Sequence, residues 1–247
     1  MKDRHRAPVL IIGAHRSGTT ATARALELLG LQIGQHLDSH REPYGLQRLH
    51  EDYLRRAGAA WYEPGPFLDR LKPPQGQREC VDYLRRNVRE NFANIFGYRN
   101  NIEGFWRRAR LNFGAAWGWK EPRTTLFAPA WLEIFPDARI IHVVRDPLAA
   151  AASIQKRELK FQATGDAPSG KIDNFDYCVA LVRTYIEAGA RLATSANYRS
   201  VRFEDLQANS AKVLAELGGF AGLDFTHTQL TRAAATIRPE GVRSTSA

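Results

Sequence analysis

The sequence of 247 residues has few cysteines and no long apolar segment. Its two cysteines, Cys80 and Cys178, form neither a CxxC pair nor a cluster with metal-ligand spacing, so we expect reduced thiols and no metal site. The apolar run from Pro8 to Ile12 is too short to span a bilayer or to form the core of a signal peptide. With no transmembrane segment elsewhere and no internal repeat, these absences predict a cytoplasmic protein.

The composition is that of a folded, basic protein. Hydrophobic residues make up 44% and charged residues 25%, which is typical of a globular chain rather than a disordered one. The net charge of +9 favours anionic partners, such as nucleic acid, acidic membrane surfaces or phosphorylated small molecules. Composition alone does not choose among these classes.

Strands and helices alternate along the chain, which predicts a mostly parallel sheet covered on both faces. The expected strands are residues 9–12, 116–120, 139–144 and 199–203. The expected helices are residues 20–29, 44–58, 80–97, 125–135, 148–157, 175–196 and 206–220. Residues 61–74 hold four prolines and are expected to be irregular, 164–171 to form a flexible loop or lid, and the polar tail 238–247 to be mobile. We therefore expect one three-layer α/β/α domain over residues 1–247, with a central, mostly parallel sheet and helical insertions.

The segment Gly13-Ala-His-Arg-Ser-Gly-Thr-Thr20 lies between the first strand and the first helix and has the GxxxxG spacing of a P-loop. Backbone N–H groups in such a turn, together with the positive end of the following helix, attract anions. Nucleotide triphosphatases carry lysine after the second glycine, where this chain has Thr19, and a cation occurs earlier instead, at Arg16. The pattern therefore favours a phosphate ligand but disfavours an ATPase or GTPase.

From Pro8 to Thr20 the sequence resembles the 5′-phosphosulfate loop of sulfotransferases, in the Arg-Ser-Gly-Thr-Thr form common in bacterial members. This resemblance implies 3′-phosphoadenosine 5′-phosphosulfate (PAPS) as the sulfo donor and adenosine 3′,5′-bisphosphate (PAP) as the product. It also implies which residues bind the 5′-phosphosulfate, namely Arg16, Ser17, Gly18, Thr19 and Thr20.

A second segment resembles the 3′-phosphate motif of the same family. Arg145 and Asp146 follow the third strand, Pro147 comes next, and Ser153 lies eight residues after the arginine. The resemblance implies that Arg145 and Ser153 bind the 3′-phosphate. The same residues also suit an ordinary helix start, with Asp146 as its cap and Pro147 at its first position.

Two further segments are similar to sulfotransferases. Trp117–Arg123 resembles a Trp-x-x-Lys-x-Pro-Arg segment of bacterial members and would bring Lys120 to the carboxyl edge of the sheet. Val201–Leu206 resembles a late strand signature, in which we expect Glu204 and Asp205 to close the strand and cap the next helix.

The resemblance implies in-line transfer of the sulfuryl group to an acceptor hydroxyl or amine. We expect Arg16 and Lys120 to stabilise the charge that develops on the leaving phosphate, although Lys120 also suits a surface position at a strand end. The histidine base of cytosolic relatives is absent. We favour Glu42 as the general base, although an ordinary exposed glutamate fits the same pattern. The remaining candidates are Asp38, His40 and Glu121.

The acceptor is expected to be a small molecule, carbohydrate or lipid. Residues 31–115 match the family poorly, and we expect this helical insertion to form the acceptor side. It contains aromatic residues that suit either a pocket or the core, namely Trp61, Tyr62, Phe67, Phe105 and Trp106.

Two other functions fit parts of the sequence. A P-loop metabolite kinase using ATP-Mg would require lysine after Gly18 and an acidic magnesium ligand directly after a buried strand, where Arg145 precedes Asp146. A nucleic-acid-binding module would use arginine-rich helical faces, but no recognised motif accompanies them, so we expect no specific nucleic acid partner. These arginines are Arg85, Arg86, Arg107, Arg108 and Arg110.

Overall fold

A computed structural model describes residues 7–98, 101–105, 109, 114–162 and 170–237 of the chain. Four parallel strands of this described part form a sheet in the order β2-β1-β3-β4. They are β1 (Val9–Ile12), β2 (Gly118–Lys120), β3 (Arg139–Val144) and β4 (Tyr198–Arg202). Ile11 lies opposite both Lys120 and Ile141, and Val144 lies opposite Arg202. The carboxyl ends of these strands therefore lie along one edge of the sheet.

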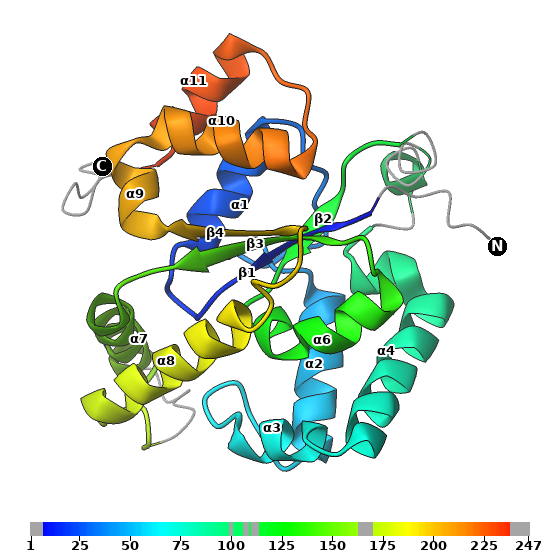
Figure 1. Ribbon diagram of the computed structural model, residues 1–247, viewed down its shortest axis with the longest axis vertical. Helices are drawn as coiled ribbons and strands as arrows, with labels where there is room; N and C mark the ends of the chain where they lie inside the picture. The colour runs from blue at the N-terminus through cyan, green and yellow to red at the C-terminus, as the bar shows by residue number, and fades with distance from the viewer. Residues whose placement is uncertain (1–6, 99–100, 106–108, 110–113, 163–169, 238–247) are drawn as a thin grey trace.

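Helices cover both faces of the sheet, with the N-terminal helix above it and the middle of the chain below it in the view of Figure 1. The upper layer consists of α1 (Thr19–Leu28), α10 (Ser210–Ala221) and α11 (His227–Ala235), and β4 leads to it through α9 (Phe203–Ala208). The lower layer consists of α6 (Thr124–Ile134), α7 (Pro147–Gln162), α8 (Phe175–Ala190) and, packed beside α6, α2 (Tyr44–Arg56), α3 (Gly65–Leu71) and α4 (Pro74–Ile95). The predicted three-layer α/β/α fold with a parallel sheet is confirmed.

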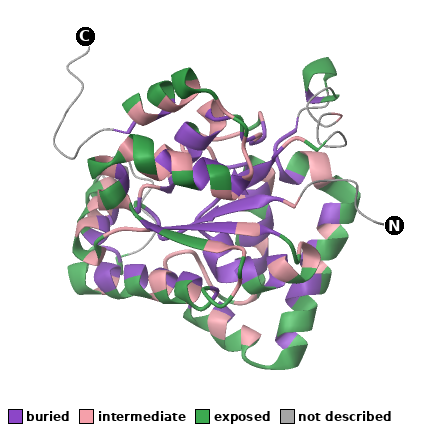
Figure 2. Cartoon of the chain, turned by 45° about the horizontal axis from the view of Figure 1, so that its top comes forward, coloured by how far each residue is buried: buried purple, intermediate pink, exposed green. Residues whose placement is uncertain are grey.

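β1, in the interior of the sheet, is apolar throughout because both faces of the sheet are buried there (Figure 2). The edge strand β4 is more polar, and most of its residues are exposed. Successive side chains of a strand point to opposite faces. Val9 and Ile11 therefore pack with α1 and α10, whereas Leu10 and Ile12 join the larger core beneath the sheet. That lower core is rich in aromatic rings, including Trp119 on β2.

The prediction for the proline-rich segment between α2 and α4 is wrong. Residues 61–74 were expected to be irregular, but they contain α3, and α4 begins at Pro74 rather than at Cys80. The prolines lie in the first turns of the two helices, where the missing N–H has no intrahelical partner to lose.

The C-terminal third also differs from the prediction. The helix expected over 206–220 is two helices, α9 and α10, which meet at the non-helical Asn209. The helix expected over 175–196 ends at Ala190. The chain also forms α11, whose start is marked by a capping box between Thr226 and Gln229 that the sequence analysis overlooked. Residues 164–169 of the expected loop 164–171, and the tail 238–247, lie outside the described residues.

Candidate active site

An open cavity of about 750 Å³ lies at the carboxyl edge of the sheet. Its wall includes residues that follow each strand: Arg16 after β1, Lys120 and Pro122 at β2, Arg145 after β3 and Phe203 after β4. The carboxyl ends of parallel strands are the usual ligand-binding edge of an open α/β sheet. The sequence-predicted residues in this wall are Arg16, Gly18, Thr19, Thr20, Glu42, Lys120 and Arg145.

The turn between β1 and α1 depends on left-handed backbone conformations. Arg16 has a φ of 66° and Gly18 a φ of 95°. A Cβ atom at Gly18 would lie 2.1 Å from the ring of Phe203, so only glycine lets this ring pack against the turn. A hydrogen bond to α6 also fixes the turn, because the Gly13 N–H donates to Thr125 Oγ1 at 2.9 Å.

Two hydroxyls predicted to bind the donor already have protein partners. Ser17 is buried, and its hydroxyl donates to the Ala14 carbonyl at 2.7 Å, so it lies beneath the cavity wall. Thr20 lies in the wall, and its hydroxyl donates to the His40 carbonyl at 3.3 Å. The phosphate-binding turn is therefore linked to the segment that carries Glu42.

The second predicted anchor is in direct contact with the first. Arg16 Nε donates to Ser153 Oγ at 3.0 Å, and Arg145 Nη1 donates to the Arg16 carbonyl at 3.1 Å. The Arg145 guanidinium also lies over the Phe203 ring, 5.7 Å from its centroid. Residues 129 and 137 positions away from Arg16 in the sequence thus converge on it.

The second segment is also a helix start, as its alternative interpretation predicted. Asp146 Oδ1 accepts the N–H of Ala149 at 2.8 Å, and Pro147 is the first residue of α7. Glu204 Oε1 accepts the Asp146 N–H at 2.8 Å, which joins the beginning of α9 to the turn after β3. Capping and the convergence on Arg16 coexist, since the cap uses Asp146 and leaves Arg145 pointing to the cavity.

The cavity wall carries an excess of positive charge. Among the described wall residues the cations are Arg16, Arg24, Lys120, Arg145 and Arg157, and Glu42 is the one carboxylate. Burial, followed by the charges of Arg157 and Arg145, lowers the pKa of Arg16. Because an anion between these guanidinium groups would relieve their repulsion, the wall favours a ligand with several negative charges.

Glu42 and Lys120 form a buried ion pair at the inner end of the cavity. Lys120 Nζ donates to Glu42 Oε1 at 2.6 Å, and the side chains are 1% and 8% exposed. Burial raises the pKa of Glu42, Lys120 opposes this rise, and the charges of Glu121 and Asp38 add to it. The pair therefore brings an amine cation and a carboxylate of weakened acidity to one side of the site.

The other base candidates lie in less suitable positions. His40 lines the cavity, but burial lowers its pKa. Both oxygens of Asp38 accept hydrogen bonds from its own loop and from Gln47. Glu121 is fully buried beneath the wall.

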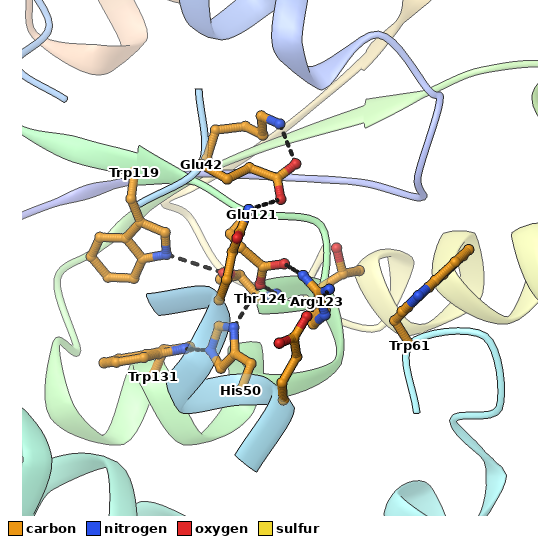
Figure 3. A network of polar contacts seen from close by, with 12 residues as sticks. Glu42, His50, Trp61, Trp119, Glu121, Arg123, Thr124 and Trp131 are labelled. Atoms are coloured by element: carbon orange, nitrogen blue, oxygen red, sulfur yellow. Dashed lines mark hydrogen bonds and ion pairs between the residues drawn. The ribbon is translucent and has the colours of Figure 1, made fainter. Parts of the chain in front are cut away.

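Glu121 belongs to a polar network that fixes the turn after β2 (Figure 3). Trp131 Nε1 donates to His50 Nε2 at 3.0 Å, so the His50 ring is neutral with its proton on Nδ1, which donates to Glu121 Oε2 at 2.6 Å. Burial lowers the pKa of His50, in agreement with a neutral ring. The Arg123 guanidinium binds the other Glu121 oxygen, and with His50 it lowers the pKa of Glu121 to about 2 against the effect of burial.

The network holds Glu121 and Arg123, the sequence neighbours of Lys120 and Pro122 in the cavity wall. The sequence analysis missed His50, because its partners come from α6 and from the turn after β2, about 70 residues or more away. It also missed His15, which lines the cavity and packs on Trp61 with ring centroids 4.4 Å apart. The only signal for His15 was its place beside Arg16.

The aromatic residues considered for a pocket or the core differ in burial and in their contacts. Phe67 is fully buried in the core, where its ring stacks on Phe127 at 4.4 Å. Trp61 packs between His15 and the guanidinium of Arg157. Phe105 is 56% exposed, and Trp106 lies outside the described residues.

No group of three or more His, Cys, Asp or Glu side chains in the described part of the chain is arranged to bind a metal ion. None of the helices described here has the length and apolar character that a bilayer span requires.

Residues 8–227 match the sequence model described as "Sulfotransferase family". No curated protein sequence matches the chain. Solved structures share its fold, among them the sulfotransferase domain of the Synechococcus PCC 7002 olefin synthase. That domain is 19% identical with a TM-score of 0.51, and the match covers 94% of this chain and 80% of that one.

Two further structures match at the same TM-score of 0.51. Sulfotransferase STF9 from Mycobacterium avium is 16% identical, with 93% of this chain and 67% of that chain covered. Mouse sulfotransferase SULT7A1, complexed with PAP, is 12% identical, with 94% and 64% covered. At these identities the structures establish the shared fold.

Proposed function

This chain belongs to the sulfotransferase family, and on that premise we propose that it transfers the sulfuryl group of PAPS to a hydroxyl or amine of an acceptor, releasing PAP. The proposal rests on one observation above all: Arg16 of the phosphate-binding turn and Arg145 with Ser153 converge in one cationic cavity. The donor carries two anionic groups, a 5′-phosphosulfate and a 3′-phosphate. Two linked anion sites are what such a ligand requires, and the mouse relative named above was complexed with PAP.

We assign the 5′-phosphosulfate to the turn that begins α1 and the 3′-phosphate to Arg145 and Ser153. N–H groups at the start of α1, the Thr19 and Thr20 hydroxyls and Arg16 are available to the first group. Thr20 would then exchange its bond with the His40 carbonyl for one with a donor oxygen. Ser17 contributes through its backbone and through the shape of the turn, since its hydroxyl is used internally.

The buried pair of Glu42 and Lys120 supplies groups for the transfer itself. In our proposal Glu42 removes the proton from the acceptor hydroxyl as the acceptor oxygen bonds to sulfur. The bond from sulfur to the bridging phosphate oxygen breaks, and Arg16 and Lys120 stabilise the charge that this oxygen gains. The acceptor is a small molecule, carbohydrate or lipid that enters from the side of the insertion 31–115.

The alternative of an ATP-Mg metabolite kinase is weaker. Thr19 takes the place of the P-loop lysine, and Asp146, which follows β3 after Arg145, already caps α7 with its Oδ1. Asp146 is exposed, and its carboxylate does not line the cavity.

A thermal shift experiment separates the two functions. PAP without metal should raise the melting temperature, whereas ATP-Mg and AMP should have much smaller effects, because a ligand stabilises the folded state that binds it. Arg16→Ala should bind PAP about 10- to 100-fold more weakly, the usual loss for hydrogen bonds to a charged group. Arg85→Ala, which removes an exposed arginine from α4, should bind PAP like the wild type. Stabilisation by ATP-Mg but not by PAP would refute the sulfotransferase assignment.

A further inference from the structure

The two carboxylate oxygens of Glu42 have different partners. Oε1 accepts from Lys120 Nζ at 2.6 Å, and Oε2 accepts from Gln47 Nε2 at 2.9 Å. The same Gln47 nitrogen donates to Asp38 Oδ2 at 2.9 Å. A primary amide nitrogen carries two hydrogens, so one amide group satisfies both carboxylates. The opposite amide orientation would turn a carbonyl oxygen toward two negative groups, which fixes the assignment of nitrogen and oxygen.

Asp38 controls the backbone of Glu42 as well. Its Oδ1 accepts the N–H groups of His40 and Glu42, each at 2.8 Å, and its own N–H donates to the Glu42 carbonyl at 3.0 Å. The loop 38–42 is therefore a closed turn around one carboxylate. Gln47, from the first turns of α2, connects that carboxylate to the side chain of Glu42.

From this geometry we propose that Gln47 is a positioning residue for Glu42. Its amide holds Oε2, so that Oε1, the oxygen beside Lys120, receives the acceptor proton. The inference rests on the proposed function, in which Glu42 is the base. It goes beyond that function because it assigns a role to Gln47 and distinguishes the two oxygens.

The hydrogen-bonding capacity of Glu42 supports this division. A carboxylate oxygen accepts more than one hydrogen bond, so an acceptor hydroxyl can share Oε1 with Lys120. A proton placed on Oε2 would weaken the bond from Gln47, whereas a proton on Oε1 leaves that bond intact and weakens the ion pair with Lys120 instead. Transfer to Oε1 also keeps the new neutral acid beside Lys120, whose charge is then available to the leaving phosphate oxygen.

The charge of residue 47 matters because several charged or titratable groups face Glu42. Lys120 and Glu121 approach from β2 and the turn after it, Asp38 from the loop, and Tyr185 from α8. Glutamine donates a hydrogen bond without adding a charge to this group. Glutamate at this position would add a third carboxylate next to Asp38 and Glu42.

The test measures the titration of Glu42 by NMR of protein labelled with ¹³C at the glutamate side-chain carboxyl carbon, with Glu42→Gln identifying the resonance. Gln47→Leu removes the donor to the carboxylate and should move the titration to higher pH. Gln47→Glu should move it further in the same direction. Gln75→Leu is the matched control, because Gln75 donates to Glu79 on the surface in the same way, and it should leave the Glu42 titration unchanged.

The wild-type protein supplies a second measurement that needs no variant. As Glu42 becomes protonated, the Gln47 side-chain amide protons should retain most of their hydrogen-bonded chemical shift, since the proton goes to Oε1. A collapse of one amide proton to the shift of a free amide, or Gln47 variants that titrate like the wild type, would overturn the proposal. Addition of PAP to the same samples tests the function separately, because absence of PAP binding would refute the donor assignment and leave the Gln47 result standing.

Discussion

At the scale of single residues, the proposed chemistry requires the carboxylate of Glu42 to be weakly acidic and still ionised at the pH of reaction. Burial makes the charged form less favourable, and the nearby Lys120 restores part of that loss. The result is a group whose pKa is above the ordinary range of glutamate. A base of this kind accepts a proton more readily than an exposed carboxylate.

Replacement of Glu42 by glutamine should therefore remove the acid limb of the pH–rate profile. In the wild type, activity should fall as the pH decreases through the raised pKa of Glu42, because the protonated form is not a base. Glu42→Gln should lower kcat by about 100- to 10,000-fold and leave the affinity for PAP nearly unchanged. The rates are measured with ³⁵S-labelled PAPS and the best acceptor from a panel of phenols and sugars. The exposed Glu79→Gln serves as the control, and a wild-type profile in Glu42→Gln would exclude this base.

Site residues were predictable from the sequence where they lie at the end of a strand or in the turn that follows it. Arg16, Lys120 and Arg145 each come just after or at the end of an apolar run, and parallel strands bring such positions together. His50 and Gln47 could not be found in this way. Their positions on α2, buried for His50 and half-buried for Gln47, are ordinary ones. Their contacts arise only after folding, which brings groups from α6 to His50 and from the loop 38–42 to Gln47.

At the scale of elements, the apolar strands were easier to predict than the helix ends. A continuous apolar run such as Val9–Ile12 has few alternatives to a buried strand. Helix ends depend on a few caps and on tertiary contacts. The end of α8 shows this, because Gly189 packs against His142 with no room for a side chain and the chain turns away after Ala190.

The turn before α1 gives a prediction at this scale. Gly18→Ala should destabilise the protein because its Cβ would overlap the Phe203 ring, in addition to the strain of a left-handed backbone. Gly30→Ala is the matched control, since Gly30 also has a positive φ (108°) but nothing within 4 Å of an added Cβ. The control should lose about 1–2 kcal/mol from backbone strain, and Gly18→Ala should lose a further 1–3 kcal/mol or so together with PAP affinity. Urea denaturation and PAP titration measure both effects, and equal losses in the two variants would contradict the packing argument.

At the scale of the whole molecule, sequence patterns predict which segments form strands but not the order of the strands in the sheet. The pattern predicted a parallel sheet with helices on both faces, but not that β1 lies between β2 and β3. The acceptor side expected over residues 31–115 stays a prediction. His40 and Glu42 of that range line the cavity together with Arg157, which packs on Trp61. These residues come from separate stretches of the chain that have no shared motif.

Folding of the whole chain also buries histidines in their neutral form, most clearly His142 on β3. Burial lowers the pKa of His142 to about 4, from an ordinary value of 6.5. Between these two values the unfolded chain binds a proton that the folded protein does not. The contribution of His142 to the free energy of unfolding should therefore be fully present above about pH 6.5. It should be lost as the pH falls toward 4. Burial lowers the pKa of His15 and His50 as well, which acts in the same direction.

Urea denaturation at pH 7 and pH 5 should reveal this linkage. His142 alone should lower the free energy of unfolding by about 2 kcal/mol between the two pH values, from the shift in its pKa. In His142→Gln this contribution is gone, so the variant should lose about 2 kcal/mol less than the wild type over the same interval, whatever its stability at pH 7. His227→Gln, at an exposed position at the start of α11, should keep the full wild-type loss. Glu121 does not affect this comparison. Its pKa is lowered from 4.5 to about 2, so its contribution to the free energy of unfolding is lost only below about pH 4.5. An equal pH dependence in His142→Gln and the wild type would mean that the buried imidazole is not the source of the acid sensitivity.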